Sequence, residues 1–230
     1  MSMSDAGEAF DKAAHGYDDW YLTEKGRQVF HAERSLIEGL LTEQGVGLEV
    51  GAGTGVFAEV LTDAGLLVVC LDLSKEMLAR ARHRSPPCVR SSAESMPLRR
   101  GCLGFAYMIT VIEFLPDPIR ALRETSQVTD EEAPLVVLFV NRESPWGELY
   151  GEMAEKGDPI FKHAHLHSLE EVKEISRKAG LSSVEEWGTL TTEPADPDAG
   201  DEVTEPSVKT GVIAVKLMKQ RLPECPNKFY

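Results

Sequence analysis

Short apolar runs alternate with segments of helical periodicity along the first 140 residues of the chain. Residues 66–71 and 135–140 are continuously apolar, as strands are when both faces of a parallel sheet are covered. Between such runs, apolar residues recur at helical spacing. Strands alternating with helices imply right-handed crossovers and helices on both faces of the sheet. The pattern predicts an α/β fold with a doubly wound, mostly parallel sheet of seven strands.

Capping residues locate several of the expected helices. Ser74 is a suitable N-cap, Asp117-Pro118 suits the N-cap and first helical position, and Ser168 is spaced from Glu171 as in a capping box. A further helix is expected over residues 29–41 and another after Gly55. Between Asn141 and Ser168 the pattern is too loose to predict an element. Strands are expected at residues 46–50, 66–71, 88–90, 103–112, 135–140, 184–187 and 211–217.

A glycine-rich turn, Gly51-Ala-Gly-Thr-Gly55, follows the strand over residues 46–50. Glycines let the backbone turn tightly and approach a ligand, and the helix that follows offers free N–H groups. The GxGxG spacing differs from the GxGxxG of dinucleotide-binding turns. Glu49 precedes the turn, where its carboxylate would repel a pyrophosphate but attract a cation. Asp72 ends the next strand, where a carboxylate can accept both hydroxyls of a ribose.

With these residues, the chain resembles the class I S-adenosylmethionine-dependent methyltransferases, in particular the small-molecule enzymes called type 11. The resemblance extends from about Phe10 to Gly188 and implies S-adenosylmethionine as the cofactor. Ser92 departs from the family pattern, in which an acid often meets the adenine. The cofactor-binding residues that the resemblance implies are Glu49, Gly51, Gly53, Gly55, Asp72, Leu73, Ala93, Glu94 and Thr110.

The N-terminal residues 1–24 resemble the family's helix that folds over the cofactor, and we expect them to form a lid. The alternative is a helix that packs only for stability. The remaining residues 25–230 are expected to form the methyltransferase domain. Within it, residues 141–167 are interpreted as an insertion on the substrate side, and the acidic residues 191–207 as a mobile loop.

Aromatic and polar residues of the lid and of the 141–167 segment are candidates for the acceptor pocket. In that segment, a rigid turn at Asn141 and aromatic packing are the structural alternatives, and Glu113 either faces the pocket or caps a helix. The candidate pocket residues are Tyr17, Trp20, Tyr21, Asn141, Trp146, Tyr150 and His165. Tyr17, His163 and His165 are the residues to test for a catalytic role, although a general base is required only when the nucleophile arrives protonated.

Three histidines alternate in His163-Ala-His-Leu-His167 and lie on one side if the segment is extended. Imidazole suits zinc, copper and nickel. Such tight alternation in one strand seldom completes a tetrahedral site, and no Cys or acid stands at a typical spacing. We therefore predict no metal site; solvated histidines or one pocket histidine are the alternatives.

Composition argues against several classes of partner, although it does not exclude a local basic patch. The formal net charge is −14, from 38 acidic and 24 basic residues, which disfavours nucleic acid and anionic membrane surfaces. The N-terminus is polar and no apolar run reaches the ~20 residues of a membrane span. The four cysteines form no CxxC pair, which is typical of a reduced cytoplasmic protein. We expect a cytoplasmic monomer or homodimer.

The predicted function is methyl transfer from S-adenosylmethionine to a small-molecule acceptor by in-line displacement. Two alternatives remain at this point. A nicotinamide-dependent oxidoreductase would use the same fold but a different glycine spacing. A non-catalytic cofactor-binding or interaction protein would share the fold without the activity. Fold alone does not name the acceptor or its nucleophilic atom.

Overall fold

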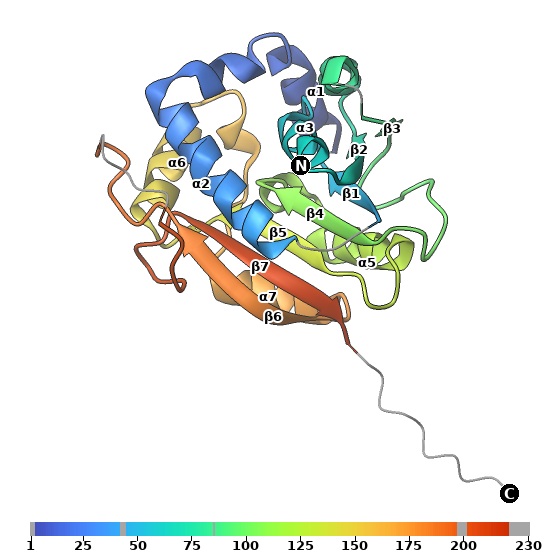
Figure 1. Ribbon diagram of the computed structural model, residues 1–230. Coiled ribbons are helices and arrows are strands. Elements are labelled where there is room, and N and C mark those ends of the chain that lie inside the picture. Colours follow the sequence, from blue (N-terminus) through green and yellow to red (C-terminus); the bar gives the residue numbers. More distant parts are fainter. Residues whose placement is uncertain (1–2, 42–44, 85, 197–201, 221–230) are drawn as a thin grey trace, which may run out of the picture.

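The computed structural model describes residues 3–41, 45–84, 86–196 and 202–220. Its strands form one sheet of seven in the order β3-β2-β1-β4-β5-β7-β6 (Figure 1). The first five strands pair in parallel, and β7 pairs antiparallel with both β5 and β6. The strands are β1 (Val46–Val50), β2 (Leu67–Asp72), β3 (Cys88–Arg90), β4 (Phe105–Ile109), β5 (Leu135–Val140), β6 (Leu181–Thr189) and β7 (Val212–Lys219). The predicted fold class is confirmed.

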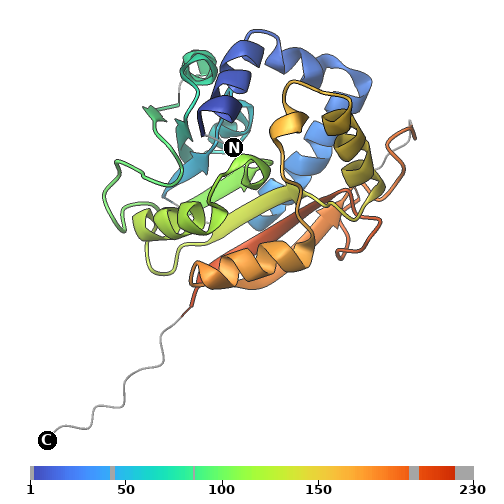
Figure 2. The same cartoon turned by 180° about the vertical axis from the view of Figure 1, so that it is seen from behind.

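Helices cover both faces of the sheet (Figures 1 and 2). One core layer joins the sheet to α2, α3 and α4, and the other joins it to α5 and α7. The α-helices are α1 (Met3–Ala13), α2 (Glu24–Leu40), α3 (Val56–Asp63), α4 (Lys75–Ala81), α5 (Pro118–Val128), α6 (Pro145–Glu155) and α7 (Leu169–Lys178). Short 3-10 helices are η1 (Tyr17–Leu22), η2 (Arg82–Arg84), η3 (Ile112–Phe114) and η4 (Phe161–His163).

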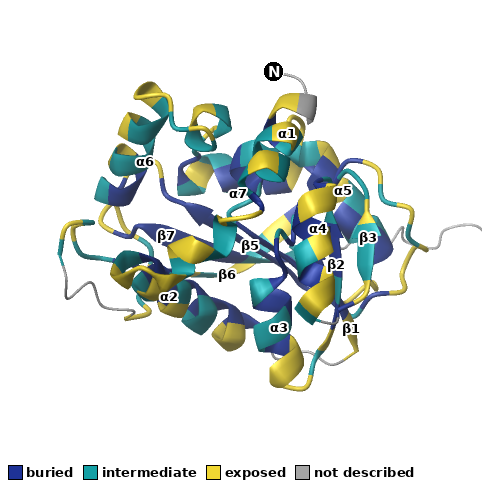
Figure 3. Cartoon of the chain, turned by 90° about the horizontal axis from the view of Figure 1, so that it is seen from above, coloured by how far each residue is buried: buried dark blue, intermediate teal, exposed yellow. Residues whose placement is uncertain are grey.

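Side chains of the central strands alternate between the two core layers. Tyr107 and Ile109 of β4 pack on the side of α2 and α3, whereas Ala106 and Met108 pack on the side of α5. Because both faces are covered, every residue of β4 and β5 is buried, as Figure 3 shows for the middle of the sheet. The continuously apolar strand sequences follow from this double burial.

The predicted helix caps are confirmed. The Ser74 hydroxyl accepts a hydrogen bond from the Met77 N–H, and the Asp117 carboxylate accepts one from the Arg120 N–H. Ser168 and Glu171 form both hydrogen bonds of a capping box. These bonds satisfy N–H groups that have no partner inside the helix.

Other elements differ from the sequence prediction. Helix α6 lies in the segment for which no element was predicted; only its first turn is buried, at Trp146 and Gly147, so it has little apolar periodicity. Strand β4 ends before the predicted residue 112 because Thr110 adopts a left-handed conformation (φ 50°) and η3 follows. Helix α2 begins at Glu24, capped by the Thr23 hydroxyl, five residues earlier than the apolar pattern indicated.

The acidic loop over residues 191–207 is described only in part, since residues 197–201 lie outside the described residues. Thr204 pairs with Gly188 of β6 through two backbone hydrogen bonds of 2.8 and 2.9 Å, so the second half of this loop is attached to the sheet. None of the described helices is long and apolar enough to cross a membrane.

Candidate functional site

The glycine-rich turn lies where the strand order reverses, between β1 and β4. Ligands of open α/β sheets bind at this point, beyond the carboxyl ends of the strands. Gly51, Gly53 and Gly55 all adopt positive φ values, of 70°, 53° and 78°. A Cβ on Gly51 would lie 2.5 Å from Val111 and one on Gly55 3.0 Å from Ala81, whereas one on Gly53 would meet no atom within 4 Å. Gly53 therefore faces open space, and the other two permit close packing.

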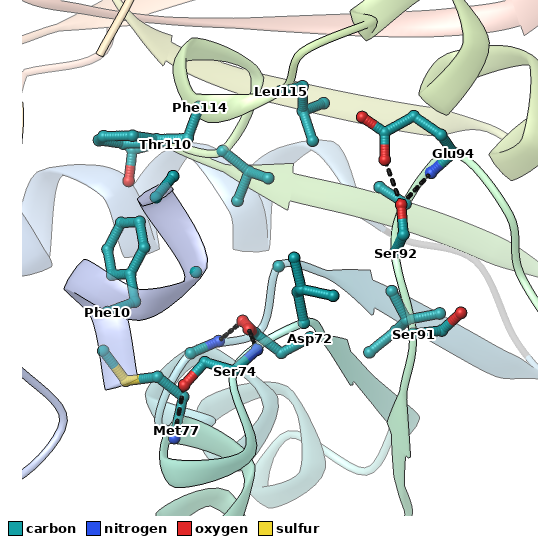
Figure 4. Close-up of a pocket in the computed structure, with 18 of the residues that line it drawn as sticks. Phe10, Asp72, Ser74, Met77, Ser91, Ser92, Glu94, Thr110, Phe114 and Leu115 are labelled. Carbon is teal, nitrogen blue, oxygen red and sulfur yellow. Dashed lines mark hydrogen bonds between the residues drawn. The ribbon is translucent and has the colours of Figure 1, made fainter. Parts of the chain in front are cut away.

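That open space is a cavity bounded by α1, the glycine turn, the end of β2, the segment after β3 and the segment after β4 (Figure 4). In Figure 4, Asp72 and Ser74 lie along one side, Ser92 and Glu94 at a second, and Phe10, Thr110 and Phe114 at a third. The structure thus brings together residues from five separate parts of the chain. The predicted cofactor residues that line the cavity are Gly51, Gly53, Asp72, Leu73, Ala93, Glu94 and Thr110.

The Asp72 carboxylate is held at the cavity wall by the backbone. Its Oδ2 accepts a hydrogen bond from the Gly53 N–H (2.8 Å), and its Oδ1 accepts one from the Ser74 N–H (2.7 Å). Burial raises the pKa of Asp72, against the lowering effect of these backbone donors. Each oxygen keeps a lone pair that can accept a hydroxyl from a ligand.

At the opposite end of the cavity, Glu94 has one oxygen without a partner. The Ser92 hydroxyl donates to Oε2 of Glu94, and the Glu94 N–H donates to the Ser92 hydroxyl. The other oxygen, Oε1, is buried and has no hydrogen-bond donor among the described residues. The sequence predicted Glu94 at this position, and it indicated that Ser92 replaces the acid that often meets the adenine in the family. The structure shows that a carboxylate oxygen is still present two residues farther along the chain.

Two of the predicted cofactor residues lie outside the cavity wall. Glu49 is 3% exposed behind the turn, and its Oε2 accepts a hydrogen bond from the Tyr107 hydroxyl (3.2 Å). Burial raises the pKa of Glu49 to about 8. Gly55 is the N-cap of α3 and packs against α4.

Helices α1 and η1 cover the cavity and are bonded to the domain below. Asp11 accepts hydrogen bonds from the Ser74 hydroxyl and the Glu76 N–H. Asp18 accepts one from the Thr54 hydroxyl (2.6 Å) and forms an ion pair with Arg84 (2.9 Å). Sequence reasoning missed these contacts, because the partners are 36 to 66 residues apart and no local pattern relates them.

A groove next to the cavity lies between α1 and the segment after η4. It is lined by Glu113, Phe114 and the three histidines His163, His165 and His167. The Val140 N–H donates to Oε1 of Glu113 (2.8 Å), and Oε2 is buried without a partner among the described residues. Burial raises the pKa of Glu113 to about 7. No group of three or more His, Cys, Asp or Glu in the described part of the chain is arranged to hold a metal ion.

The remaining candidate residues divide between the acceptor side and the core. Tyr17 lines the cavity. Tyr150 does not line it and stacks on Phe161, with ring centroids 4.3 Å apart. Asn141 donates its side-chain N–H groups to the Ser207 and Thr210 carbonyls, and Trp146 is 1% exposed with its indole N–H bonded to the Thr192 carbonyl.

Asn141 and Trp146 therefore hold the end of the sheet together and line neither the cavity nor the groove. Trp20 is 39% exposed at the surface of η1 and also lies outside both. Tyr21 lies between Tyr17 and Phe30, with ring centroids 6.2 and 5.5 Å away. Of the lid aromatics, Tyr17 and Tyr21 thus point inward.

Comparison with known proteins supports a methyltransferase fold and domain. A model described as a methyltransferase domain matches residues 48–137. The crystal structure of a SAM-dependent methyltransferase from Thermotoga maritima, described as a possible histamine N-methyltransferase, superimposes with a TM-score of 0.84 and 29% identity, covering 94% of this chain and all of that one. The matched domain and the fold are those of the class I S-adenosylmethionine-dependent methyltransferases. S-adenosylmethionine is thus the family's cofactor, as the sequence predicted.

Two relatives that match most of the chain are uncharacterised proteins. A protein of Methanocaldococcus jannaschii is 27% identical, covering 91% of this chain and 98% of its own. A protein of Mycobacterium tuberculosis is 30% identical over 193 residues, covering 82% of this chain. The chain spans 65% of the length of that mycobacterial relative.

Proposed function

We propose that this chain binds S-adenosylmethionine in the cavity and transfers its methyl group to a small-molecule acceptor. The observation that carries the proposal is the set of free groups around the cavity. The open space at Gly53 suits the methionine chain of the cofactor, and the fixed carboxylate of Asp72 suits its ribose. The unpaired oxygen of Glu94 suits the amine of its adenine. The adjacent groove with its mixed apolar and polar lining suits a small acceptor.

When bound, S-adenosylmethionine would supply a methyl group activated by its sulfonium. The acceptor's nucleophilic atom would attack this methyl carbon in line with the C–S bond, and the electron pair of that bond would leave with the sulfur of S-adenosylhomocysteine. The residues of the chain then contribute position and exclusion of water. The Asp72 carboxylate is fixed by two backbone donors, so it can orient a ribose without moving. Helices α1 and η1, bonded through Asp11 and Asp18, keep water from the reacting atoms.

Two measurements test the proposal. Calorimetry measures the binding of S-adenosylhomocysteine, and an activity assay measures its formation from S-adenosylmethionine with each of a panel of small acceptors. We expect a single site per chain and turnover with at least one acceptor. A protein that fails to bind either compound at millimolar concentration would rule out the function.

Glu94 is expected to select adenine by accepting a hydrogen bond from its exocyclic amine. Wild-type protein should bind S-adenosylhomocysteine at least about tenfold more tightly than S-inosylhomocysteine. The inosine analogue has a carbonyl oxygen in place of the amine, and two acceptor oxygens cannot form a hydrogen bond with each other. Glu94→Gln should narrow the preference, because an amide can donate as well as accept. Calorimetry with both ligands measures the ratio of the two affinities. An unchanged ratio in Glu94→Gln would show that Glu94 does not contact the adenine.

The lid is expected to open more often when Asp18 loses its charge. Asp18→Asn weakens the bonds to Thr54 and Arg84. Losing a partly exposed ion pair should destabilise the closed lid by up to about 1 kcal/mol, which corresponds to a roughly fivefold faster proteolytic cleavage of the lid. Trypsin cleavage near Lys12 and Lys25 measures opening, and S-adenosylhomocysteine should slow it. Asp19→Asn, whose exposed side chain has no ion pair in the described structure, is the matched control; equal rates in both variants would refute the role of Asp18.

A further inference from the structure

The cavity wall contains acidic side chains but no basic ones. Of the described residues that line it, Asp72 and Glu94 carry carboxylates, and none is a lysine, an arginine or a histidine. Asp72 accepts two backbone hydrogen bonds, and Oε1 of Glu94 is buried without a donor among the described residues. Because neither carboxylate has a cationic partner in the wall, the cavity favours a ligand that carries positive charge.

Three aromatic rings meet at one side of the same cavity. They are Phe10 of α1, Tyr17 of η1 and Phe114 of η3, and all three line the cavity. The Phe10 ring contacts the other two, with its centroid 5.1 Å from that of Phe114 and 6.3 Å from that of Tyr17. The interplanar angles of 82° and 62° are those of edge-to-face pairs. The three rings therefore form a corner of the cavity and not a stack.

Helix α1 places Phe10 across the middle of the cavity. The next residue, Asp11, accepts a hydrogen bond from the Ser74 hydroxyl, which attaches this turn of α1 to the segment that follows β2. On its other side, Phe10 contacts Phe114, which belongs to the segment that follows β4. Figure 4 shows Phe10 between Thr110 and Phe114 on one side and Ser74 on the other. Phe10 therefore bridges the carboxyl ends of β2 and β4.

The sulfur of the cofactor is expected at this corner. Sulfur joins the ribose to the methionine chain, and the proposed function assigns these two parts to Asp72 and to the open space at Gly53. The Gly53 N–H lies 2.8 Å from Oδ2 of Asp72, so the two subsites are adjacent. Thr110, whose left-handed backbone (φ 50°) follows β4, lines the cavity beside the rings. Since Asp72 and Glu94 lie on the other sides of the cavity in Figure 4, aromatic rings are what this corner offers to a cation.

We propose that the rings of Phe10, Tyr17 and Phe114 make this chain select the charged form of its cofactor, so that S-adenosylmethionine binds more tightly than S-adenosylhomocysteine. This proposal rests on the methyltransferase function proposed above. An aromatic face attracts the positive charge of a sulfonium, and the thioether of the product carries no such charge. The two carboxylates of the wall act in the same direction, because S-adenosylmethionine carries one positive charge more than S-adenosylhomocysteine. Loss of the methyl group then weakens binding and favours release of the product.

The ring contacts continue away from the cavity, and this continuation provides a control. Tyr21 lies next to Tyr17 and contacts Phe30 of α2, with ring centroids 5.5 Å apart. Phe30 in turn contacts Phe57 of α3, with ring centroids 5.2 Å apart. Phe30 is not among the residues that line the cavity, so its ring packs the fold without facing the cofactor. A ring that serves only for packing should affect the binding of charged and neutral ligands alike.

Calorimetry with matched ligands tests the role of the charge. Wild-type protein is titrated with S-adenosylmethionine, with S-adenosylhomocysteine, and with the neutral carbon analogue in which a CH group replaces the sulfonium sulfur. The carbon analogue keeps the methyl group and lacks the charge, so it controls for the size of the methyl group. We expect S-adenosylmethionine to bind at least about fivefold more tightly than either neutral compound, as for a cation at desolvated aromatic faces.

Phe10→Leu should reduce the ratio of the affinity for S-adenosylmethionine to that for S-adenosylhomocysteine about threefold or more, because it removes a ring and keeps an apolar side chain. Phe10→Tyr keeps the ring and should keep the wild-type ratio. Phe30→Leu is the matched control, and it should lower the Tm through lost packing but leave the ratio unchanged.

The outcomes separate this inference from the proposed function. The inference is wrong if wild-type protein binds either neutral compound as tightly as S-adenosylmethionine, or if Phe10→Leu keeps the wild-type ratio. A protein that binds none of the three compounds would overturn the proposed function, and this inference with it.

Discussion

Gly53→Val is expected to abolish cofactor binding, with an affinity loss greater than about a hundredfold. The space beyond the Gly53 Cα is empty of protein atoms to 4 Å and opens into the cavity, so a valine side chain would occupy the place of the cofactor. The Gly53 N–H also donates to Asp72, and a β-branched residue at φ 53° would displace that donor. Calorimetry with S-adenosylhomocysteine measures the loss.

Gly101→Val is the matched control for backbone strain. Gly101 also has a positive φ, of 61°, and a Cβ there meets no atom within 4 Å, but its loop is exposed and does not line the cavity. Both variants should therefore lose similar stability, about 1–2 kcal/mol for a non-glycine residue in the left-handed region. Normal binding by Gly53→Val, or equal loss of binding in both, would show that this turn is not where the cofactor binds.

Asp72→Ala is expected to lower the affinity for S-adenosylhomocysteine about ten- to a hundredfold, the roughly 1.5–3 kcal/mol of a hydrogen bond to a charged group. The carboxylate is fixed by the Gly53 and Ser74 N–H groups and faces the cavity, so its loss removes the ribose partner and loosens the turn. Because burial raises the pKa of Asp72, the substitution also removes a desolvated charge, and we expect the fold to survive. Calorimetry and a melting curve measure the two effects.

Asp130→Ala is a suitable control, because Asp130 likewise accepts a backbone N–H, that of Glu131 (2.7 Å), but does so in an exposed turn away from the cavity. It should bind S-adenosylhomocysteine as wild type does. Unchanged affinity in well-folded Asp72→Ala would refute the assignment of Asp72 to the ribose.

Features that depend on residues close together in the chain were predictable from the sequence alone. Apolar runs and helical periodicity predicted all seven strands and most helices. A strand buried on both faces needs a continuous apolar run, and a helix buried on one face needs apolar residues at helical spacing. The Ser168–Glu171 capping box and the glycine turn were also readable, since each spans only a few residues. Helix α6 was not, because so little of it is buried.

Contacts between side chains from distant parts of the chain became known only from the three-dimensional structure. It placed Asn141 and Trp146 in the structural core rather than at the acceptor side, joined Asp18 to Arg84 across 66 residues, and left oxygens of Glu94 and Glu113 without donors. Glu33 reads in the sequence as an ordinary charged position on an amphipathic helix. This residue is 5% exposed because α2 packs against the sheet, and no local spacing encodes contacts between segments that distant.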